Sequence, residues 1–375
     1  MKRNIAIASL FIVSVLVSQV IHAKIWRVNN KSNYNGSTLW GDNFGGSAAY
    51  PVFKQINQAA IYGTTLAGDT IHVEGSTEPY DGLTINKRLV ILGTGFYLTD
   101  NPATNNNTLE SDVRYIDFNT GSSGSIVSGI NFTYEGSSFD ANVYVNTSNI
   151  TIKRCRIEKS VELGFPLSDV YIIQNFFPST YNTNAIVTDG SSLFTPPTDL
   201  VFNNNICQKS FRWGTPITNP TTLWPVLQCN NNVFDGPDNL ATPSLAFSTS
   251  EFRNNILMAT NAIVNIAASS GVITHNIGTL ASQFGTSDNN LVVPAITTLF
   301  ISSTSNDGKY QVAGGSQANN NGSDATDRGA FGGSAVTSRY TLSGLAPIPV
   351  IYEITTTGVA TPTGLPVSIK ARTIK

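Results

Sequence analysis

One short phrase recurs between residues 149 and 276 and constrains the fold more than any other feature of the sequence. Each copy has alternating apolar residues, a polar pair, an Asn or its substitute, and apolar residues again. The copies are ITIKRCRI (150–157), VYIIQNFF (170–177), LVFNNNIC (200–207), VLQCNNNVF (226–234), SEFRNNIL (250–257) and VITHN (272–276). Alignment on Cys155, Asn175, Asn205, Asn231, Asn255 and His275 gives spacings of 20, 30, 26, 24 and 20 residues. Units of this size with variable insertions are typical of solenoids.

The recurring Asn has a structural interpretation. A bend between two parallel strands puts one residue near left-handed geometry, which Asn and Gly tolerate better than other residues. Equivalent amides in stacked units can then hydrogen-bond along the stack as a ladder. The functional alternative is an Asn-lined sugar-binding face, which requires outward-pointing side chains. We expect His275 to substitute for Asn in the last slot, unless Asn276 takes that position, and a catalytic His275 is the alternative.

The composition favours short strands joined by turns and argues against nucleic-acid binding. Charged residues make up 12% of the chain, against a usual share of roughly 25%, while Gly, Asn, Ser and Thr are abundant. The formal charge is −2, and loss of Lys2 and Arg3 with a signal peptide would leave 20 basic against 24 acidic residues, or −4. A protein that binds nucleic acid nonspecifically needs a basic face instead.

Residues 1–23 are predicted to be a secretory signal peptide. Two basic residues precede an apolar run from Ile5 to Ile21, and the small residue Ala23 ends the segment. An uncleaved membrane anchor is the alternative. With the signal removed we expect no membrane span, and a protein that is secreted to the extracellular space, the cell surface or the periplasm.

The sequence divides into three further parts. Residues 24–67 predict a first strand at 24–29, a polar loop, and an amphipathic helix at 51–62 that begins at a proline. Residues 68–333 contain the strands and repeats. Residues 334–375 form a Pro-containing C-terminal β tail with two expected strands, VIYEI and VSIKA.

The pattern AGDTIHVEG (67–75) followed by YDGLTINKRLVILGTG (80–95) resembles the N-terminal part of pectate-lyase-like proteins. The resemblance implies an all-β fold, a single-stranded right-handed parallel β-helix whose open end is capped by the amphipathic helix. The chain departs from the catalytic signatures of such proteins. Polygalacturonase-like members carry Asn-Thr-Asp, Asp-Asp, Gly-His-Gly and Arg-Ile-Lys, and pectate lyases carry Trp-Ile-Asp-His, none of which occurs here.

Function in a solenoid usually resides in insertions between its strands. The longest insertions are 179–199 and 208–225, and we expect loops 179–225 to rise side by side. Phe211, Trp213 and Trp224 offer aromatic faces for sugar rings, and Arg212 could hold a carboxylate. In the alternative interpretation these aromatic side chains clamp the loop onto the rod.

Acidic residues near these loops are the candidates for catalysis. A glycoside hydrolase needs two carboxyl groups. A calcium-dependent lyase needs a cluster of acidic oxygens that binds Ca²⁺ beside a Lys or Arg base. The candidates are Asp235 with Asp238, Glu158 with Glu162, Asp189 and Asp199, and the bases are Lys159, Lys209 and Arg212. Asp235-Gly-Pro-Asp238 is also an ordinary turn sequence, and Asp324 and Asp327 have the same interpretation. No metal site is predicted unless the lyase hypothesis holds.

Three cysteines follow the predicted signal, namely Cys155, Cys207 and Cys229, and their spacing fits no zinc motif. We expect small buried side chains, with a Cys207–Cys229 disulfide as the alternative. The leading functional hypothesis is a noncatalytic module that contacts polysaccharide or a cell-surface glycan through loops 179–225. A diverged polysaccharide lyase or glycoside hydrolase and a purely structural surface rod are the alternatives.

Overall fold

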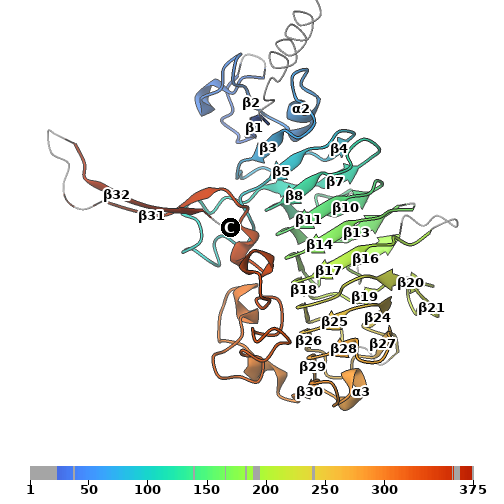
Figure 1. Cartoon of the computed structure of the whole chain (residues 1–375). Helices are drawn as coiled ribbons and strands as arrows, with labels where there is room; N and C mark the ends of the chain where they lie inside the picture. Colours follow the sequence, from blue (N-terminus) through green and yellow to red (C-terminus); the bar gives the residue numbers. More distant parts are fainter. Residues whose placement is uncertain are drawn as a thin grey trace, which may run out of the picture.

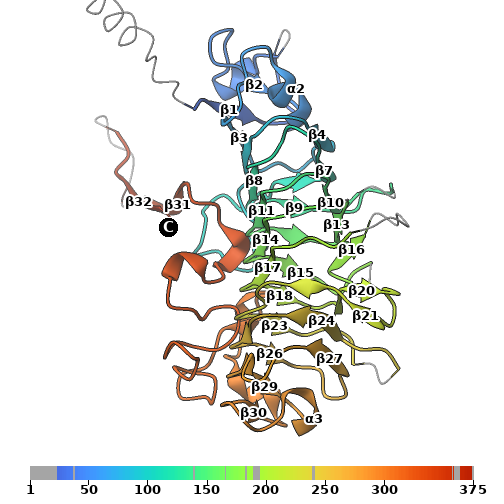
Figure 2. The same cartoon turned by 45° about the vertical axis from the view of Figure 1, so that its right-hand side comes forward.

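The computed structural model describes residues 23–36, 39–137, 140–164, 166–181, 184–188, 195–238, 241–356, 358 and 364–373. The predicted signal peptide, apart from Ala23, and Asp189 therefore lie outside the described residues. The described chain is largely β, with three stacks of short parallel strands (Figures 1 and 2). No helix among the residues described is long and apolar enough to cross a bilayer.

The described strands form three main parallel sheets. Sheet 1 contains β1 (Ile25–Val28), β2 (Val52–Phe53), β3 (Thr70–Val73), β5 (Val90–Leu92), β8 (Ile126–Ser128), β11 (Ile150–Lys153), β14 (Val170–Ile173) and β17 (Leu200–Asn203). Sheet 2 contains β6 (Asp112–Val113), β9 (Asn131–Phe132), β12 (Arg156–Ile157), β15 (Phe176–Phe177), β18 (Ile206–Cys207), β23 (Val233–Phe234), β26 (Ile256–Leu257), β29 (Ile277–Gly278) and β30 (Leu291–Val292). Sheet 3 contains β4 (Leu83–Ile85), β7 (Tyr115–Phe118), β10 (Asn142–Val145), β13 (Val161–Leu163) and β16 (Ile186–Thr188).

Smaller pairings extend this arrangement. A parallel group follows sheet 3 in the chain and contains β19 (Phe211–Arg212), β22 (Pro225–Val226), β24 (Leu245–Thr249) and β27 (Val264–Ala267). Two short pairs are β20 (Gly214–Thr215) with β21 (Thr222–Leu223) and β25 (Phe252–Arg253) with β28 (Ile273–Thr274). Helical turns lie at α3 (Ala281–Phe284), Asp42–Phe44, Ile296–Leu299, Gly308–Tyr310, Val336–Ser338 and Leu342–Gly344.

The chain visits sheets 1, 2 and 3 in the same order in each of its central passages, and one such passage is called a repeat below. Strands β11, β14 and β17 of successive repeats pair in register, so Ile152 lies beside Ile172 and Ile172 beside Phe202. These three side chains are fully buried. Alternate residues on each strand point inward, because side chains alternate across a strand, and they stack into one continuous apolar core.

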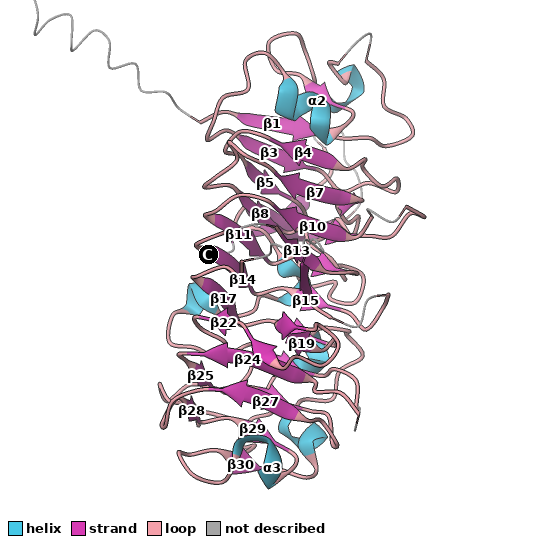
Figure 3. Cartoon of the chain, turned by 90° about the vertical axis from the view of Figure 1, so that its right-hand side faces the viewer, coloured by secondary structure: helices cyan, strands magenta, loops and turns pink. Residues whose placement is uncertain are grey.

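The predicted helix at 51–62 is shorter than expected. Residues Val52–Phe53 pair with β1 as strand β2, and helix α2 runs only over Ile56–Ile61. Gln55 begins the helix by a reciprocal cap with Gln58, whose Oε1 accepts the Gln55 backbone N–H at 3.0 Å. The apolar face of α2 packs against β1, β3 and β4, which puts the helix over the first repeat (Figure 3).

The asparagine ladder exists, but the predicted member Asn231 is wrong by one residue. The ladder members are Asn175, Asn205, Asn232, Asn255, Asn276 and Asn290, with Cys155 in the preceding slot. Each Asn Oδ1 accepts the backbone N–H of the ladder residue in the preceding repeat, at 2.8–3.0 Å. Asn232 therefore replaces the expected Asn231, and at 275–276 the alternative Asn276 is confirmed in place of His275.

The left-handed position is a separate one, immediately before the ladder slot. It is occupied in successive repeats by Gly129, Arg154, Gln174, Asn204, Asn231, Asn254, His275 and Asn289, all with φ between 53° and 74°. The expectation that one Asn would both bend the chain and form the ladder is therefore wrong. The backbone of one residue makes the bend, and the side chain of the next joins the repeats.

The segment 318–346, called the strap, returns along the outside of this left-handed column (Figure 1). Asn204 Nδ2 donates to the carbonyl oxygens of Ala330 and Gly332 at 2.9 and 2.8 Å, and Arg154 donates to that of Leu345 at 3.1 Å. Beneath the strap and the adjoining segment lies a second apolar core. Its buried members on the outer face of sheet 2 include Phe176, Ile206, Val233, Ile256 and Ile277. Ala330 and Tyr340 of the strap and Tyr310, which precedes the strap, pack against them.

The two strands expected in the tail are present. VIYEI lies within β31 (Pro349–Thr356) and VSIKA within β32 (Val367–Thr373), and the two pair as an antiparallel hairpin that projects from the stack (Figure 1). The three cysteines are free and buried. The Cys207–Cys229 disulfide is therefore not formed. Burial raises the pKa of the Cys155 and Cys207 thiols to about 12.

Candidate functional site

The aromatic residues predicted to face a ligand lie mostly inside the molecule. Phe211 and Trp213 are fully buried. Phe211 stacks on Phe202 with ring centroids 4.3 Å apart, and Trp213 meets the half-buried Trp224 edge-on at 4.9 Å. Neither Phe211 nor Trp213 offers a ring face to a sugar, so the predicted ligand surface is corrected at these two positions. This burial is what the structural-rod hypothesis predicts.

The predicted basic residues are also engaged within the fold. Arg212 is 7% exposed, and it donates to Asn184 Oδ1 and to the Thr218 carbonyl oxygen, both at 2.9 Å. Lys209 is buried, and its Nζ donates to the Thr180 carbonyl oxygen. Burial lowers the pKa of Lys209 to about 8. Both side chains hold loop backbone rather than face an open cleft.

Asp235 and Asp238 bind different partners. Asp235 accepts a hydrogen bond from the Tyr310 hydroxyl at 2.5 Å, which ties the repeat to the C-terminal segment. Asp238 accepts from the hydroxyl of Thr260 at 2.5 Å and from the backbone N–H of Asn261, and these bonds lower its pKa. The turn interpretation of Asp238 therefore accounts for its contacts. Among the described residues no contact is shared by the two carboxylates, as an acid pair would require.

The remaining acidic candidates are dispersed. Each of the following contacts lies within the described part of the chain. Glu158 pairs with Arg156 at 2.8 Å, and the neighbouring base Lys159 donates from Nζ to the Ser137 carbonyl oxygen at 3.2 Å. Glu162 lies on β13. The other three carboxylates accept hydrogen bonds from nearby side chains: Asp199 from Thr198, Asp324 from Thr326, and Asp327 from Asn319. Within the described residues no group of three His, Cys, Asp or Glu side chains is placed to hold a metal ion.

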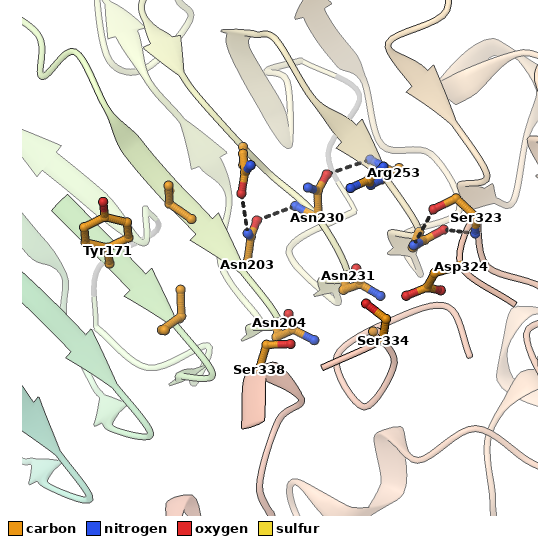
Figure 4. A pocket seen from close by; sticks show the side chains of 15 residues that line it. Tyr171, Asn203, Asn204, Asn230, Asn231, Arg253, Ser323, Asp324, Ser334 and Ser338 are labelled. Atoms are coloured by element: carbon orange, nitrogen blue, oxygen red, sulfur yellow. Dashed lines mark hydrogen bonds between the residues drawn. The ribbon is translucent and has the colours of Figure 1, made fainter. Parts of the chain in front are cut away.

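The structure has a cleft of about 420 Å³ between the outer face of sheet 1 and the strap. Figure 4 shows Asn204 and Asn231, from the repeats, facing Ser338 and Ser334, from the strap, across this cleft. Tyr171 lies farther along the same sheet face (Figure 4). The cleft is therefore formed by two segments, residues 171–254 and 323–338, whose nearest ends are 69 residues apart in sequence, and loops 179–225 supply little of it.

Side-chain amides form a continuous row along the sheet wall of this cleft. Asn203 Nδ2 donates to Gln228 Oε1 at 3.1 Å, and Asn203 Oδ1 accepts the Asn230 backbone N–H at 2.8 Å. Asn230 Oδ1 in turn accepts the Arg253 backbone N–H at 3.0 Å (Figure 4). These bonds fix the amide planes and leave further donor and acceptor capacity directed at the cleft, because each amide can make about four hydrogen bonds.

Asn231 differs from its neighbours in this wall. The residue is 7% exposed, and its Nδ2 has no hydrogen-bond partner among the described residues. An unsatisfied buried amide costs on the order of 1–3 kcal/mol. The donor faces the strap side of the cleft, near Asp324 and Ser334 (Figure 4), so a bound oxygen atom there would satisfy it.

The runs NNN at 203–205 and 230–232 explain this arrangement. In each run the first Asn points outward into the cleft, the second takes the left-handed conformation, and the third joins the ladder. The sequence analysis placed a single ladder Asn in each run, so it did not predict that Asn203 and Asn230 would line a cleft. The recurrence of three adjacent Asn residues at the same phase of the repeat was the available signal.

A second polar cluster lies on the outer face of sheet 2. Asp112, Asn131 and Arg156 are in register on β6, β9 and β12. Asn131 Nδ2 donates to both Glu110 and Asp112, at 2.9 and 2.8 Å, so the two carboxylates share one amide. Burial, and then the charge of Asp112, raise the pKa of Glu110 to about 7. Sequence reasoning missed this pair because a loop brings Glu110 to the edge of the sheet.

Comparison with protein-family models, with curated proteins and with solved structures found no match to this chain. The pectate-lyase-like resemblance is therefore still a prediction.

Proposed function

We propose that this protein is a noncatalytic module that binds polysaccharide in the cleft between sheet 1 and the strap. The observation that carries the proposal is the row of fixed amides ending at Asn231, whose buried Nδ2 lacks a partner. Amides that are held in place and open to one side suit sugar hydroxyls, which both donate and accept hydrogen bonds. The binding surface is thus moved from loops 179–225 to this cleft.

The charges around the cleft favour an uncharged glycan. Arg253 forms an ion pair with Glu251, and Asp324 lies on the opposite wall. No other Lys or Arg is among the described lining residues. A polyanion would therefore gain little from Arg253 and would be repelled by Asp324, whereas a neutral sugar avoids both costs.

The proposal includes a finer account of the fold, in which the stacked sheets are turns of one right-handed parallel β-helix. The constant order of sheets 1, 2 and 3, and the pairing of each strand with its counterpart one repeat later, support it. Parallel crossovers are almost always right-handed. The secreted location predicted from residues 1–23 fits a protein that meets polysaccharide outside the cytoplasm.

A glycan screen on the full mature chain tests the proposal. The same samples are assayed for reducing ends and for unsaturated products. We expect binding to at least one neutral polysaccharide without product release. Absence of binding to any glycan, with the protein folded, would contradict the proposal and favour the structural-rod hypothesis.

A diverged glycoside hydrolase is the second candidate, and the Glu110–Asp112 pair is the observation that favours it. Two carboxyl groups of unequal environment are the minimum machinery for glycoside hydrolysis, with the higher-pKa group as acid. Burial raises the pKa of both groups, and Glu110, whose pKa reaches about 7, would be the acid with Asp112 as its partner. Release of reducing ends that is lost in Glu110→Gln, while glycan binding is kept, would support this candidate over the noncatalytic one.

A further inference from the structure

The outer face of sheet 3 carries a second surface suited to sugars, far in sequence from the amide row. Tyr115 and Asp117 point outward from β7, and Tyr144 points outward from β10. The register puts Tyr144 beside Asp117, and Asp117 beside Thr84 on β4. Figure 3 shows β4, β7 and β10 stacked at this face. With Asn146 these residues line a shallow cleft of about 210 Å³.

The two tyrosine rings form a corner. Their centroids are 6.2 Å apart and their planes meet at 83°. Both side chains are half-buried, so each ring is supported by the sheet and still reaches the surface. An aromatic face held in this way can pack against the C–H side of a sugar ring, because it buries apolar area without first losing side-chain freedom.

Two glycines fix this surface. A Cβ at Gly82 would lie 2.0 Å from the Tyr115 ring, and a Cβ at Gly164 would lie 2.3 Å from Asn146 Oδ1. Any side chain at either position would displace the group that lies over it. The glycines therefore let Tyr115 lie close over Gly82 and Asn146 close over Gly164, which is the preorganisation that a binding surface needs.

Two hydrogen bonds orient the carboxylate of Asp117 and leave it able to accept more. Asn146 Nδ2 donates to its Oδ1 at 3.0 Å, and Asn119 Nδ2 donates to its Oδ2 at 2.9 Å. Each oxygen keeps one lone pair for a further donor. Burial raises the pKa of Asp117, and the two amide bonds oppose that shift.

We infer that the surface formed by Tyr115, Asp117, Tyr144 and Asn146 is a second glycan subsite, which selects neutral or amino sugars and rejects uronates. This inference rests on the proposed polysaccharide-binding function and specifies its ligand class. A sugar hydroxyl or ammonium group donates to Asp117 while the ring packs on the tyrosines. Among the described residues that line this cleft there is no cation, and the carboxylate repels a second carboxylate.

The experiment uses the mature chain and isothermal titration with three probes: cellohexaose, xylohexaose and hexagalacturonate. We expect at least one neutral hexaose to bind at two sites per chain, and hexagalacturonate to bind at least tenfold more weakly. Tyr144→Ala should remove one of the two sites. Tyr50→Ala, at an exposed tyrosine outside the cleft, is the matched control and should leave both.

Asp117→Asn gives the charge test. It keeps the shape and the hydrogen-bonding side chain, so we expect it to narrow the preference for the neutral probe over hexagalacturonate by at least fivefold. Two sites that persist in Tyr144→Ala would overturn the subsite and leave the amide cleft standing. Tighter binding of hexagalacturonate than of either neutral probe would overturn the subsite and also the preference of the amide cleft for an uncharged glycan. No binding of any of the three probes to the folded wild-type chain would overturn the subsite, and the proposed function falls with it if the glycan screen also finds no binding.

Discussion

The Oδ1 atom of Asn232 accepts two hydrogen bonds from Asn205, one from its backbone nitrogen at 2.9 Å and one from its side-chain Nδ2 at 3.2 Å. At the same time Asn232 Nδ2 donates to the Phe202 carbonyl oxygen and to Asn255 Oδ1. A single buried side chain thus satisfies polar groups in three successive repeats. The ladder resolves a problem of the fold, since these backbone groups lie where water cannot reach them.

Replacing Asn232 by Ala should destabilise the protein strongly. The change leaves the Asn205 N–H and the Phe202 carbonyl oxygen without these partners, at roughly 1–3 kcal/mol for each buried group. We expect a loss of about 3 kcal/mol or more in the free energy of unfolding, measured by urea denaturation. Asn86→Ala, at an exposed position, should change it by less than about 0.5 kcal/mol. Equal stability of the two variants would show that the ladder contributes little.

Gly329→Ala should loosen the strap without unfolding the stack. Gly329 has φ 86°, and a Cβ there would lie 3.0 Å from Ile256 Cδ1 and 3.1 Å from Val233 Cγ2. The strap should therefore lift from the second core, and trypsin should cut at Arg328 or Arg339 severalfold faster than in the wild type. Gly314→Ala is the control, since nothing lies within 4 Å of its Cβ. Wild-type resistance in Gly329→Ala would refute the strap's dependence on this contact.

The pKa of Glu110 predicts how stability depends on pH. Its ordinary value is 4.5, and in the folded chain burial raises it to about 7. Between these values the folded state holds a proton that the unfolded state has lost, so stability should fall as pH rises from about 5 to 8. The loss attributable to Glu110 is on the order of 3 kcal/mol at most.

Glu110→Gln should flatten this dependence, and urea unfolding at pH 5 and pH 8 measures it. Asp288→Asn is the matched control. It changes an exposed carboxylate at a left-handed position that Asn tolerates, and it should keep the wild-type slope. If Glu110→Gln and the wild type lose the same stability over this range, Glu110 does not carry the proton.

Much of the fold could be predicted from the sequence, because the apolar alternation and the spacing of the Asn runs both follow the repeat. The exact ladder register could not be predicted from spacing alone. In the run 230–232 all three residues are Asn, and both the left-handed bend and the ladder slot favour Asn, so Asn231 and Asn232 were indistinguishable. The pair His275-Asn276 posed the same difficulty, and only the hydrogen bonds separate the two roles.

The candidate site was harder to predict than the fold. Phe211, Arg212 and Trp213 alternate as a strand does, and period-two alternation predicts that both rings point inward. The prediction of a ligand surface rested on the length of the insertion and did not take this alternation into account. The cleft itself needs the strap, whose path along the repeats depends on contacts such as Asn204 with Ala330. No local pattern in the sequence encodes such a pairing across 126 residues.

The most direct test of the central claim is the glycan affinity of Asn231→Gly. Asn231 has φ 55°, which Gly adopts without strain, so the variant removes the unpartnered Nδ2 and keeps the backbone. We predict that the affinity for the best neutral glycan of the screen, measured by isothermal titration, falls about tenfold, as expected for the loss of one well-made hydrogen bond. The melting temperature should not fall. Wild-type affinity in the folded Asn231→Gly variant would contradict the account.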